Sequence, residues 1–377
     1  MDKGFDTTVA AVKCDSYERK LVREKVRNAI NLAGGFPKKI KPGSKVLLKP
    51  NLLTAKHPDA AVTTHPEVLR AVIKELKDFG VTDITVGDSP AGRHDWNRLW
   101  EKTGIKKVAE DEEVKLIPFV NMKTIFINKH VRVPVLKELD DFDAVISLPK
   151  LKTHLLTKMT GAVKNSYGLV IGQAKSHFHG EYPSPRKMSS FIADLYSHLK
   201  PDFVIMDAIK SQEGDGPNTG KPYNSGVILA GRDGVAVDSC ACIIYDYDYN
   251  DVLMLLKAVE KGYGIADHEL IDKKGDAWES MEKAYCRRSK ADFLFKIPEK
   301  LFFILTMVAK CRPSFDKKKC IKCGLCAEAC VQQAIIKKKK CYKVKSSKCV
   351  LCMCCIEACP YQALNLKTTK IWNYFSN

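Results

Sequence analysis

Eight cysteines near the C-terminus have the spacing of an iron–sulfur site. They form two runs, Cys320-x-x-Cys323-x-x-Cys326-x-x-x-Cys330 and Cys349-x-x-Cys352-x-x-Cys355-x-x-x-Cys359. Each run has the spacing of cysteines whose thiolates bind the irons of a [4Fe–4S] cluster. Because one cubane needs four thiolates and the spacing occurs twice, the sequence predicts two [4Fe–4S] clusters.

Residues 315–366 resemble the bacterial two-[4Fe–4S] ferredoxins, which are small α+β domains. In that family the fourth cysteine of each run binds the other cluster. Two positions depart from the family pattern: Val331 stands where a proline usually follows the first run, and Met353-Cys354 replaces the Gly324-Leu325 of the first run. Cys354 is an alternative ligand, but the spacing favours its neighbours. The resemblance implies these ligand sets: Cys320, Cys323, Cys326 and Cys359 for cluster I, and Cys330, Cys349, Cys352 and Cys355 for cluster II.

Zinc binding and disulfide formation account less well for the cysteines. Cys-x-x-Cys pairs also build zinc ribbons, but the third cysteine of each run and the repeated spacing disfavour zinc. A disulfide framework is typical of small secreted domains. The seven remaining cysteines show no paired framework, so we expect them to be free thiols.

Polar side chains follow several predicted strands in the first part of the chain. In doubly wound sheets the strand ends and the loops after them form the ligand crevice. We expect the lysines to bind an anionic substrate, His154 to donate protons as a general acid, and the carboxylates to orient groups or bind a metal. Catalytic roles are predicted for Asp88, Lys152 and His154. The predicted substrate-binding residues are Lys49, Asn51, Lys150, Lys164, Asn165, Glu213 and Asp215.

Each of these residues is also compatible with an ordinary structural role. A lone histidine is more often a hydrogen-bonded structural residue, and Lys-Pro and Asp-Gly-Pro sequences are common turns. His177 and His179 lie on one face of a predicted extended segment, which would make them a metal pair if further ligands joined them. No glycine-rich nucleotide fingerprint is present, although a flavin site needs no short motif.

Alternating strand and helix patterns indicate an α/β domain with a mostly parallel sheet. Thr64 is predicted to cap the second helix, with Glu67 completing a capping box. Strands are expected at 7–13, 45–49, 83–86, 114–119, 123–127, 143–148, 203–206 and 227–230. Helices are expected at 17–33, 64–79, 96–102, 159–171, 186–199, 234–245 and 251–261.

The segment 265–313 is predicted to be a basic helical connector between the first domain (1–264) and the ferredoxin domain (314–377). Its longest apolar run, Leu301–Ala309, would span roughly 13.5 Å as a helix, well short of a bilayer core of about 30 Å. Basic flanks would suit an interfacial helix on anionic lipid. We favour packing against the first domain, because short apolar runs are more often core.

The charge balance predicts the kind of partner. The chain has 62 Lys and Arg against 44 Asp and Glu, and its formal net charge is +18. Thirteen lysines oppose three carboxylates after residue 313, so we expect the ferredoxin region to dock an acidic redox carrier such as a ferredoxin or flavodoxin. No nucleic-acid motif accompanies the charge. Free thiols and oxygen-sensitive clusters predict a cytoplasmic location, and Met1–Asp15 lacks the apolar core of a signal peptide.

Residues 45–250 resemble a family of unknown function, family 362, which is often fused to bacterial ferredoxin modules. The resemblance implies the fusion and no substrate. The motifs that carry it are Lys49-Pro50-Asn51-Leu52, Thr63-Thr64-His65-Pro66-Glu67, Val86-Gly87-Asp88-Ser89-Pro90, Leu148-Pro149-Lys150-Leu151-Lys152-Thr153-His154, Gly161-Ala162-Val163-Lys164-Asn165 and Glu213-Gly214-Asp215-Gly216-Pro217.

These observations predict an electron-transfer oxidoreductase that passes electrons from a reduced carrier to an anionic substrate or cofactor in the first domain. An additional flavin or metal is compatible with this function. One alternative is a non-enzymatic redox relay or maturation factor that delivers electrons to a partner enzyme. Another is a metal-dependent isomerase or transferase in which the clusters are structural.

Overall fold

The chain is organised around a mixed sheet of ten strands. The computed structural model describes residues 4–90, 95–289, 292–302, 304, 311–339 and 341–367. Eight strands follow one another across the sheet in the order β12-β1-β11-β10-β7-β2-β3-β4, while β8 pairs with β10 and β9 pairs with β8. The strands are β1 (Val9–Lys13), β2 (Lys45–Pro50), β3 (Asp83–Asp88), β4 (Lys115–Pro118), β7 (Ala144–Leu148), β8 (Lys150–His154), β9 (Lys158–Thr160), β10 (Phe203–Glu213), β11 (Lys221–Gly231) and β12 (Lys273–Lys274).

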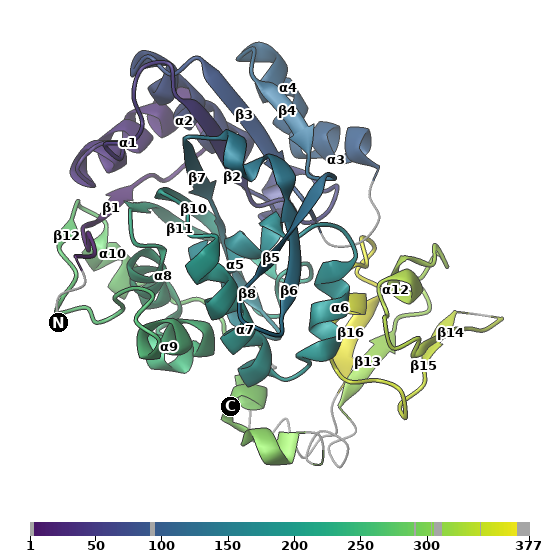
Figure 1. Cartoon of the computed structure of the whole chain (residues 1–377). Helices are drawn as coiled ribbons and strands as arrows, with labels where there is room; N and C mark the ends of the chain where they lie inside the picture. The colour runs from purple at the N-terminus through teal and green to yellow at the C-terminus, as the bar shows by residue number, and fades with distance from the viewer. Residues whose placement is uncertain are drawn as a thin grey trace.

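Helices cover both faces of this sheet, and each face has its own apolar core (Figure 1). One core lies under α1 (Arg19–Leu32), α2 (Pro66–Asp78), α3 (Trp96–Thr103) and α4 (Ile105–Asp111). The other lies under α5 (Ala162–Asn165), α7 (Pro185–His198), α8 (Gly234–Cys242) and α9 (Leu253–Glu260). Strands such as β2 and β7 are buried on both faces, as expected of a parallel sheet. The predicted α/β fold with a mostly parallel sheet is confirmed.

The register of the parallel strands brings their carboxyl ends to one edge. Leu48 of β2 lies opposite Val86 of β3 and Ile146 of β7. Val204 of β10 lies opposite Ser147 of β7. The polar residues that follow these positions therefore gather at one place, as the strand pattern predicts.

Residues 150–154 form a strand where a loop was predicted. Lys150 pairs with Asp207 and Lys152 with Gln212 of β10, and β9 closes the other edge of β8. All five residues of β8 are buried, and a buried loop would leave backbone polar groups without partners. Strand β10 is longer than predicted and supplies those partners.

Two further local predictions are wrong. The N-cap of α2 is His65, because Pro66 takes the first helical position. The Thr64 hydroxyl instead donates to the Leu148 carbonyl at 2.6 Å. The helix predicted at 159–171 is divided into β9, α5 and a 3-10 turn at Ser166–Leu169.

The ferredoxin region packs beside helix α6 (Ala174–Glu181) (Figure 1). Gly180 of α6 allows close approach, since a Cβ there would meet Val331 Cγ2 at 2.6 Å. Asn218, which is buried, donates to the Cys359 carbonyl at 2.7 Å and to the Glu357 carbonyl at 3.2 Å. The elements of this region are β13 (Arg312–Phe315), α12 (Leu325–Glu328), β14 (Ile335–Lys337), β15 (Tyr342–Val344), α13 (Cys354–Glu357) and β16 (Leu364–Lys367).

The connector is described only in part. It contains β12, which pairs with β1 beyond the predicted boundary at residue 264, and α10 (Trp278–Glu282). Leu294, Ile297 and Phe302 pack in one apolar cluster with ferredoxin residues. Most of the predicted helix at 301–309 lies outside the described residues. Within the described parts, no helix has the length and apolar character needed to cross a membrane.

His65 gives the fold a testable pH dependence. Its Nδ1 accepts from the Glu67 N–H at 3.2 Å, and its ring stacks on Tyr17 at 3.5 Å between centroids. Burial lowers the pKa of His65 from 6.5 to about 4. As the pH falls below 6.5, His65 takes up a proton in the unfolded chain before it does so in the folded protein, so the free energy of unfolding should fall.

We expect wild type to lose about 2 kcal/mol more unfolding free energy than His65→Asn between pH 7 and pH 5. Asparagine is a good N-cap without a titrating group. Urea unfolding of the holo-protein at several pH values measures the difference. If the free energies of unfolding of the two proteins changed equally with pH, the lowered pKa of His65 would be contradicted.

Candidate functional site

The two sets of cysteines implied by the ferredoxin resemblance line two separate cavities. One cavity is lined by Cys320, Cys323, Cys326 and Cys359. The other is lined by Cys330, Cys349, Cys352 and Cys355, with Cys354 beside them. The fourth cysteine of each run therefore lies with the first three cysteines of the other run.

This arrangement fits two [4Fe–4S] clusters. Backbone N–H groups donate to the fourth cysteine of each run, from Ala334 to Cys330 Sγ at 3.2 Å and from Ala363 to Cys359 Sγ at 3.3 Å. Such bonds to the sulfurs are among the interactions that tune a cluster. Nowhere in the described ranges do three His, Cys, Asp or Glu side chains converge as ligands of a single ion. A cubane needs no such convergence, because each thiolate binds a different iron.

The two cysteine sets differ in their surroundings. The first set has one exposed, one half-buried and two buried cysteines, whereas the second set has three half-buried cysteines and one that is buried. The second cavity shares Cys354 with a small cavity of about 20 Å³ that is also lined by His179 and Glu357. Both sets therefore border the α/β domain: Cys323 of the first set lines a cavity with Thr54, Arg98 and Ser176, and Cys354 beside the second set lines the small cavity with His179.

Lys49 and Asp88 form a buried ion pair at the ends of β2 and β3. Lys49 Nζ lies 2.8 Å from Asp88 Oδ1 and donates to Asn165 Oδ1 at 3.0 Å. The other carboxylate oxygen of Asp88 accepts from the Leu52 N–H at 2.7 Å. Burial lowers the pKa of Lys49, and Asp88 opposes that shift.

A second buried ion pair joins Lys150 and Asp207. The distance from Lys150 Nζ to Asp207 Oδ2 is 2.8 Å. The Tyr17 hydroxyl accepts from Lys150 at 2.7 Å and donates to Asp207 at 2.8 Å. Asp207 also accepts from the His65 N–H at 2.8 Å.

Lys152 has only neutral partners among the described residues, namely Asn51 Oδ1 at 2.5 Å and the Val62 carbonyl at 2.8 Å. Burial and the nearby Lys164 hold the pKa of Lys152 well below its usual value. Lys49, Lys150 and Lys152 are thus buried with their amines already bonded. Their predicted roles toward a substrate stay predictions.

Glu213 and Asp215 contact the connector. Glu213 accepts from the Arg287 backbone N–H and side chain, both at 3.0 Å. Asp215 accepts from the Ser289 hydroxyl at 3.0 Å. The structure therefore places these carboxylates where they fix the connector to β10, while their predicted part in substrate binding stays a prediction.

His154 reaches from the end of β8 to the ferredoxin region. Its Nδ1 accepts from the Leu156 and Thr157 N–H groups at 3.0 and 3.3 Å, which places the ring proton on Nε2. Nε2 lies 3.3 Å from Glu357 Oε1, without the alignment of a hydrogen bond. Burial holds the pKa of His154 well below its usual value, so the ring is neutral at pH 7 and acts as an N–H donor.

Lys164 and His179 complete this interface. Among the described residues, Lys164 Nζ has neither a hydrogen bond nor an ion pair, and burial lowers its pKa while Glu357 opposes the shift. The Nδ1 of His179 also lacks a partner within the same described parts, and burial lowers the pKa of His179 to about 4. The interface therefore collects unsatisfied polar groups beside the second cysteine set.

Two residues of this interface were not predicted from the sequence. Glu357 lies inside the second cysteine run, where the cysteine spacing gives it no signal of its own. His179 was paired with His177 on an extended segment, but both lie on helix α6. Two residues apart on a helix they point to different sides: His177 is exposed beside Glu181, and His179 is buried. The expected extended segment with both rings on one face is therefore wrong.

The buried ion pair gives a stability prediction. We expect Asp207→Ala to cost about 3–5 kcal/mol of unfolding free energy, because Lys150 is left buried without a counter-charge. Asp83→Ala, which removes the solvent-accessible pair with Lys115, should cost at most about 1 kcal/mol. Urea unfolding of the holo-proteins measures both. Equal losses would show that Asp207 does not neutralise Lys150.

Comparison with known proteins gives the family. Residues 46–243 match the domain of unknown function DUF362, and residues 313–336 and 342–365 match the 4Fe-4S binding domain. The thylakoid-associated protein sll1697 of Synechocystis sp. is 32% identical over 235 residues, which are 61% of this chain and 72% of that protein. A crystal structure of a Thermotoga maritima protein has 16% sequence identity and a TM-score of 0.37, covers 56% of this chain, and has only 55% of its own length covered in return. The chain belongs to the DUF362 family and carries a C-terminal ferredoxin-type region, which makes it an iron–sulfur electron-transfer protein.

Proposed function

We propose that this protein is an oxidoreductase in which reduction of a small anionic molecule takes place at the interface between the ferredoxin region and the α/β domain. The observation that carries the proposal is the position of Lys164 and His154 beside Glu357 and the second cysteine set. When bound, the clusters supply one-electron transfer. The protein side chains at the interface supply charge and hydrogen bonds.

Lys164 is suited to bind the anion. It lacks a carboxylate partner within the described parts of the chain, and burial penalises its charged form. An anion placed beside it would favour that charged form and would itself be neutralised. His154 directs its Nε2–H toward Glu357 without a well-aligned hydrogen bond, so this donor is available to a substrate oxygen.

The exposed lysines of the ferredoxin region suit an acidic carrier. Lys317, Lys318, Lys319 and Lys322 are exposed next to the exposed Cys323. Ile321 among them has 58% of its surface exposed. An apolar side chain ringed by like charges is typical of a docking face for a partner of opposite charge.

The reductase proposal is tested by anaerobic turnover. Reconstituted protein is mixed with reduced ferredoxin or dithionite and a set of candidate anions, and product formation is followed. We expect Lys164→Gln to lower turnover at least 100-fold, because the cation that binds the anion is removed. Lys20→Gln, at an exposed position on α1, is the matched control.

Turnover of Lys164→Gln at the wild-type rate would disprove the assignment of the site. If no anion is reduced and the protein instead purifies with a partner enzyme, the non-enzymatic relay replaces the proposal. The exposed Cys323 beside a basic face would serve that relay equally well.

The carrier proposal predicts a charge effect. The triple variant Lys317→Glu, Lys318→Glu, Lys319→Glu should slow reduction by an acidic ferredoxin by roughly 10- to 100-fold at low salt, since electrostatic steering is reversed. The gap should narrow as salt is added. Stopped-flow reduction measures the rates, with Lys38→Glu, Lys41→Glu, Lys129→Glu as the charge-matched control. Equal slowing by both triple variants would mean that net charge, and no particular face, governs docking.

A further inference from the structure

We infer that the cavity between the α/β domain and the ferredoxin region binds a small dipolar molecule, with an anionic group at Arg98 and an amine or amide donor at Glu328. This inference goes beyond the proposed function, because none of the predicted substrate-binding residues lines this cavity. It concerns recognition and does not depend on which reaction follows.

The cavity has the size of a ligand site. Its volume is about 320 Å³, within the range of pockets that hold small molecules. Its walls come from five separate parts of the chain: the loop after β2, α3 with its N-cap, the start of helix α6, the ferredoxin helix α12 with Cys323, and the segment 358–361 after α13. Sites of this kind are common where two domains meet.

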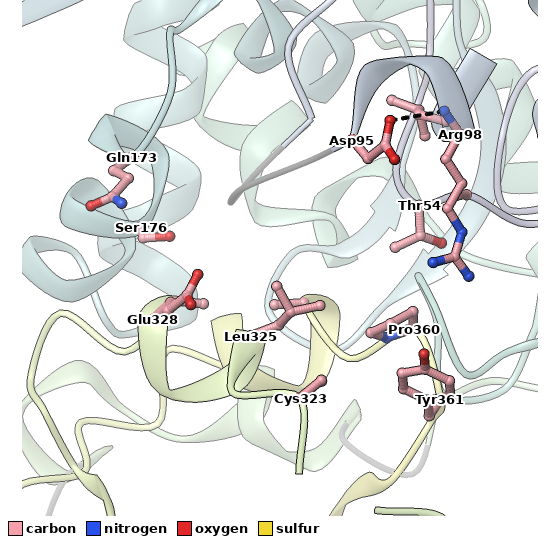
Figure 2. A pocket seen from close by; sticks show the side chains of 14 residues that line it. Thr54, Asp95, Arg98, Gln173, Ser176, Cys323, Leu325, Glu328, Pro360 and Tyr361 are labelled. Carbon is pink, nitrogen blue, oxygen red and sulfur yellow. Dashed lines mark hydrogen bonds between the residues drawn. The ribbon is translucent and has the colours of Figure 1, made fainter. Parts of the chain in front are cut away.

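The two ends of the cavity carry opposite charge. Figure 2 shows Arg98 and Thr54 at one end, Ser176 and Glu328 at the other, and Leu325 between them. Among the described residues, the Arg98 guanidinium has no ion pair and Glu328 has none either. A guanidinium without a carboxylate partner is a ready site for a carboxylate or phosphate.

The remaining carboxylate in the lining is already used. Asp95 Oδ1 caps α3 by accepting from the Arg98 N–H at 3.1 Å. Asp95 stays a carboxylate beside Arg98, held by this hydrogen bond. Among the described lining residues Glu328 is the carboxylate with neither a hydrogen bond nor an ion pair, and the apolar side chain of Leu325 lies between it and Arg98 (Figure 2). A simple anion would meet only half of this pattern, whereas a dipolar molecule with an apolar body meets all of it.

The cavity adjoins the first cysteine set. Cys323, Leu325 and Tyr361 line both this cavity and the one formed by Cys320, Cys326 and Cys359. At its other end Ser176, Ala329 and Ala358 are shared with the small cavity of His179 and Glu357. A bound molecule would thus lie in contact with the walls of the interface that the proposed function uses.

The test uses ω-amino acids as probes. Anaerobic holo-protein is titrated calorimetrically with 4-aminobutyrate, 6-aminohexanoate and 8-aminooctanoate. The same titration is done with carboxylates and amines of the same chain lengths, which carry only one of the two charges. We expect one ω-amino acid to bind at least 10-fold more tightly than its single-ended counterparts.

Variants locate the site. Arg98→Gln and Glu328→Gln should each lower the affinity for the ω-amino acid at least 10-fold. The iron content and the melting temperature should be unchanged. Arg132→Gln and Glu110→Gln, at exposed positions elsewhere, should leave binding unchanged. The charge-swapped variant Arg98→Glu, Glu328→Arg should recover affinity, because a dipolar molecule can bind in the reverse direction.

The inference is overturned if no ω-amino acid binds better than the single-ended probes, or if Arg98→Gln and Glu328→Gln bind as wild type does. Binding without any turnover in the reductase assay would leave this inference standing and would count against the proposed function alone. Turnover without binding of an ω-amino acid would overturn this inference and would support the proposed function.

Discussion

The buried carboxylate of Asp207 is the point on which the positioning of the site depends. It accepts hydrogen bonds from the Tyr17 hydroxyl and the His65 backbone and forms an ion pair with Lys150. These groups come from the chain before α1, from the start of α2 and from β8. A buried charge must keep its partners, so the register of β8 on β10 is closely constrained. That register determines where β8 ends, and it places His154, the last residue of β8, against the ferredoxin region.

The ferredoxin region is asymmetric in how it meets solvent and protein. Its first cysteine set lies beside exposed lysines, and its second lies against His154, His179 and Lys164. Docking of the ferredoxin region is supported by Asn218, whose amide donates to the backbone carbonyls of Glu357 and Cys359 in the second cysteine run. Cys323 of the first set also lines the interdomain cavity, so the first set borders the α/β domain as well.

The two cysteine runs and the strand ends could be predicted because their chemistry is local, whereas the exchange of the fourth cysteines between the clusters was implied by the ferredoxin resemblance. A cubane needs thiolates at short fixed spacings, and polar residues that follow apolar strands must meet at one edge of a parallel sheet. Whether those side chains are open to a ligand or already paired within the protein could not be predicted from the sequence. Whether Lys49 is open to a substrate depends on Asp88 and Asn165, which are distant in sequence and close only in the fold.

The same limit explains the residues that were missed. Glu357 is one of three spacer residues in a cysteine run, where its neighbours account for the pattern. His179 was assigned to the wrong face because a two-residue spacing means one side in a strand and different sides in a helix. The interdomain cavity is lined by residues from separate parts of the chain, among them Thr54, Arg98, Ser176 and Leu325. No single stretch of sequence contains enough of these residues to predict the cavity.

The buried polar atoms at the interface are costly to the stability of the fold. His154 Nε2, His179 Nδ1 and Glu357 Oε1 are buried without hydrogen-bond partners among the described residues, and each such group typically costs about 1–3 kcal/mol. A structural interface would be more stable with apolar residues at these positions. The adjoining cavity of about 20 Å³ is large enough for a water molecule. Because His179 and Glu357 both line this cavity, a water molecule in it can bridge them, whereas His154 does not line it and has Glu357 as its nearest polar neighbour.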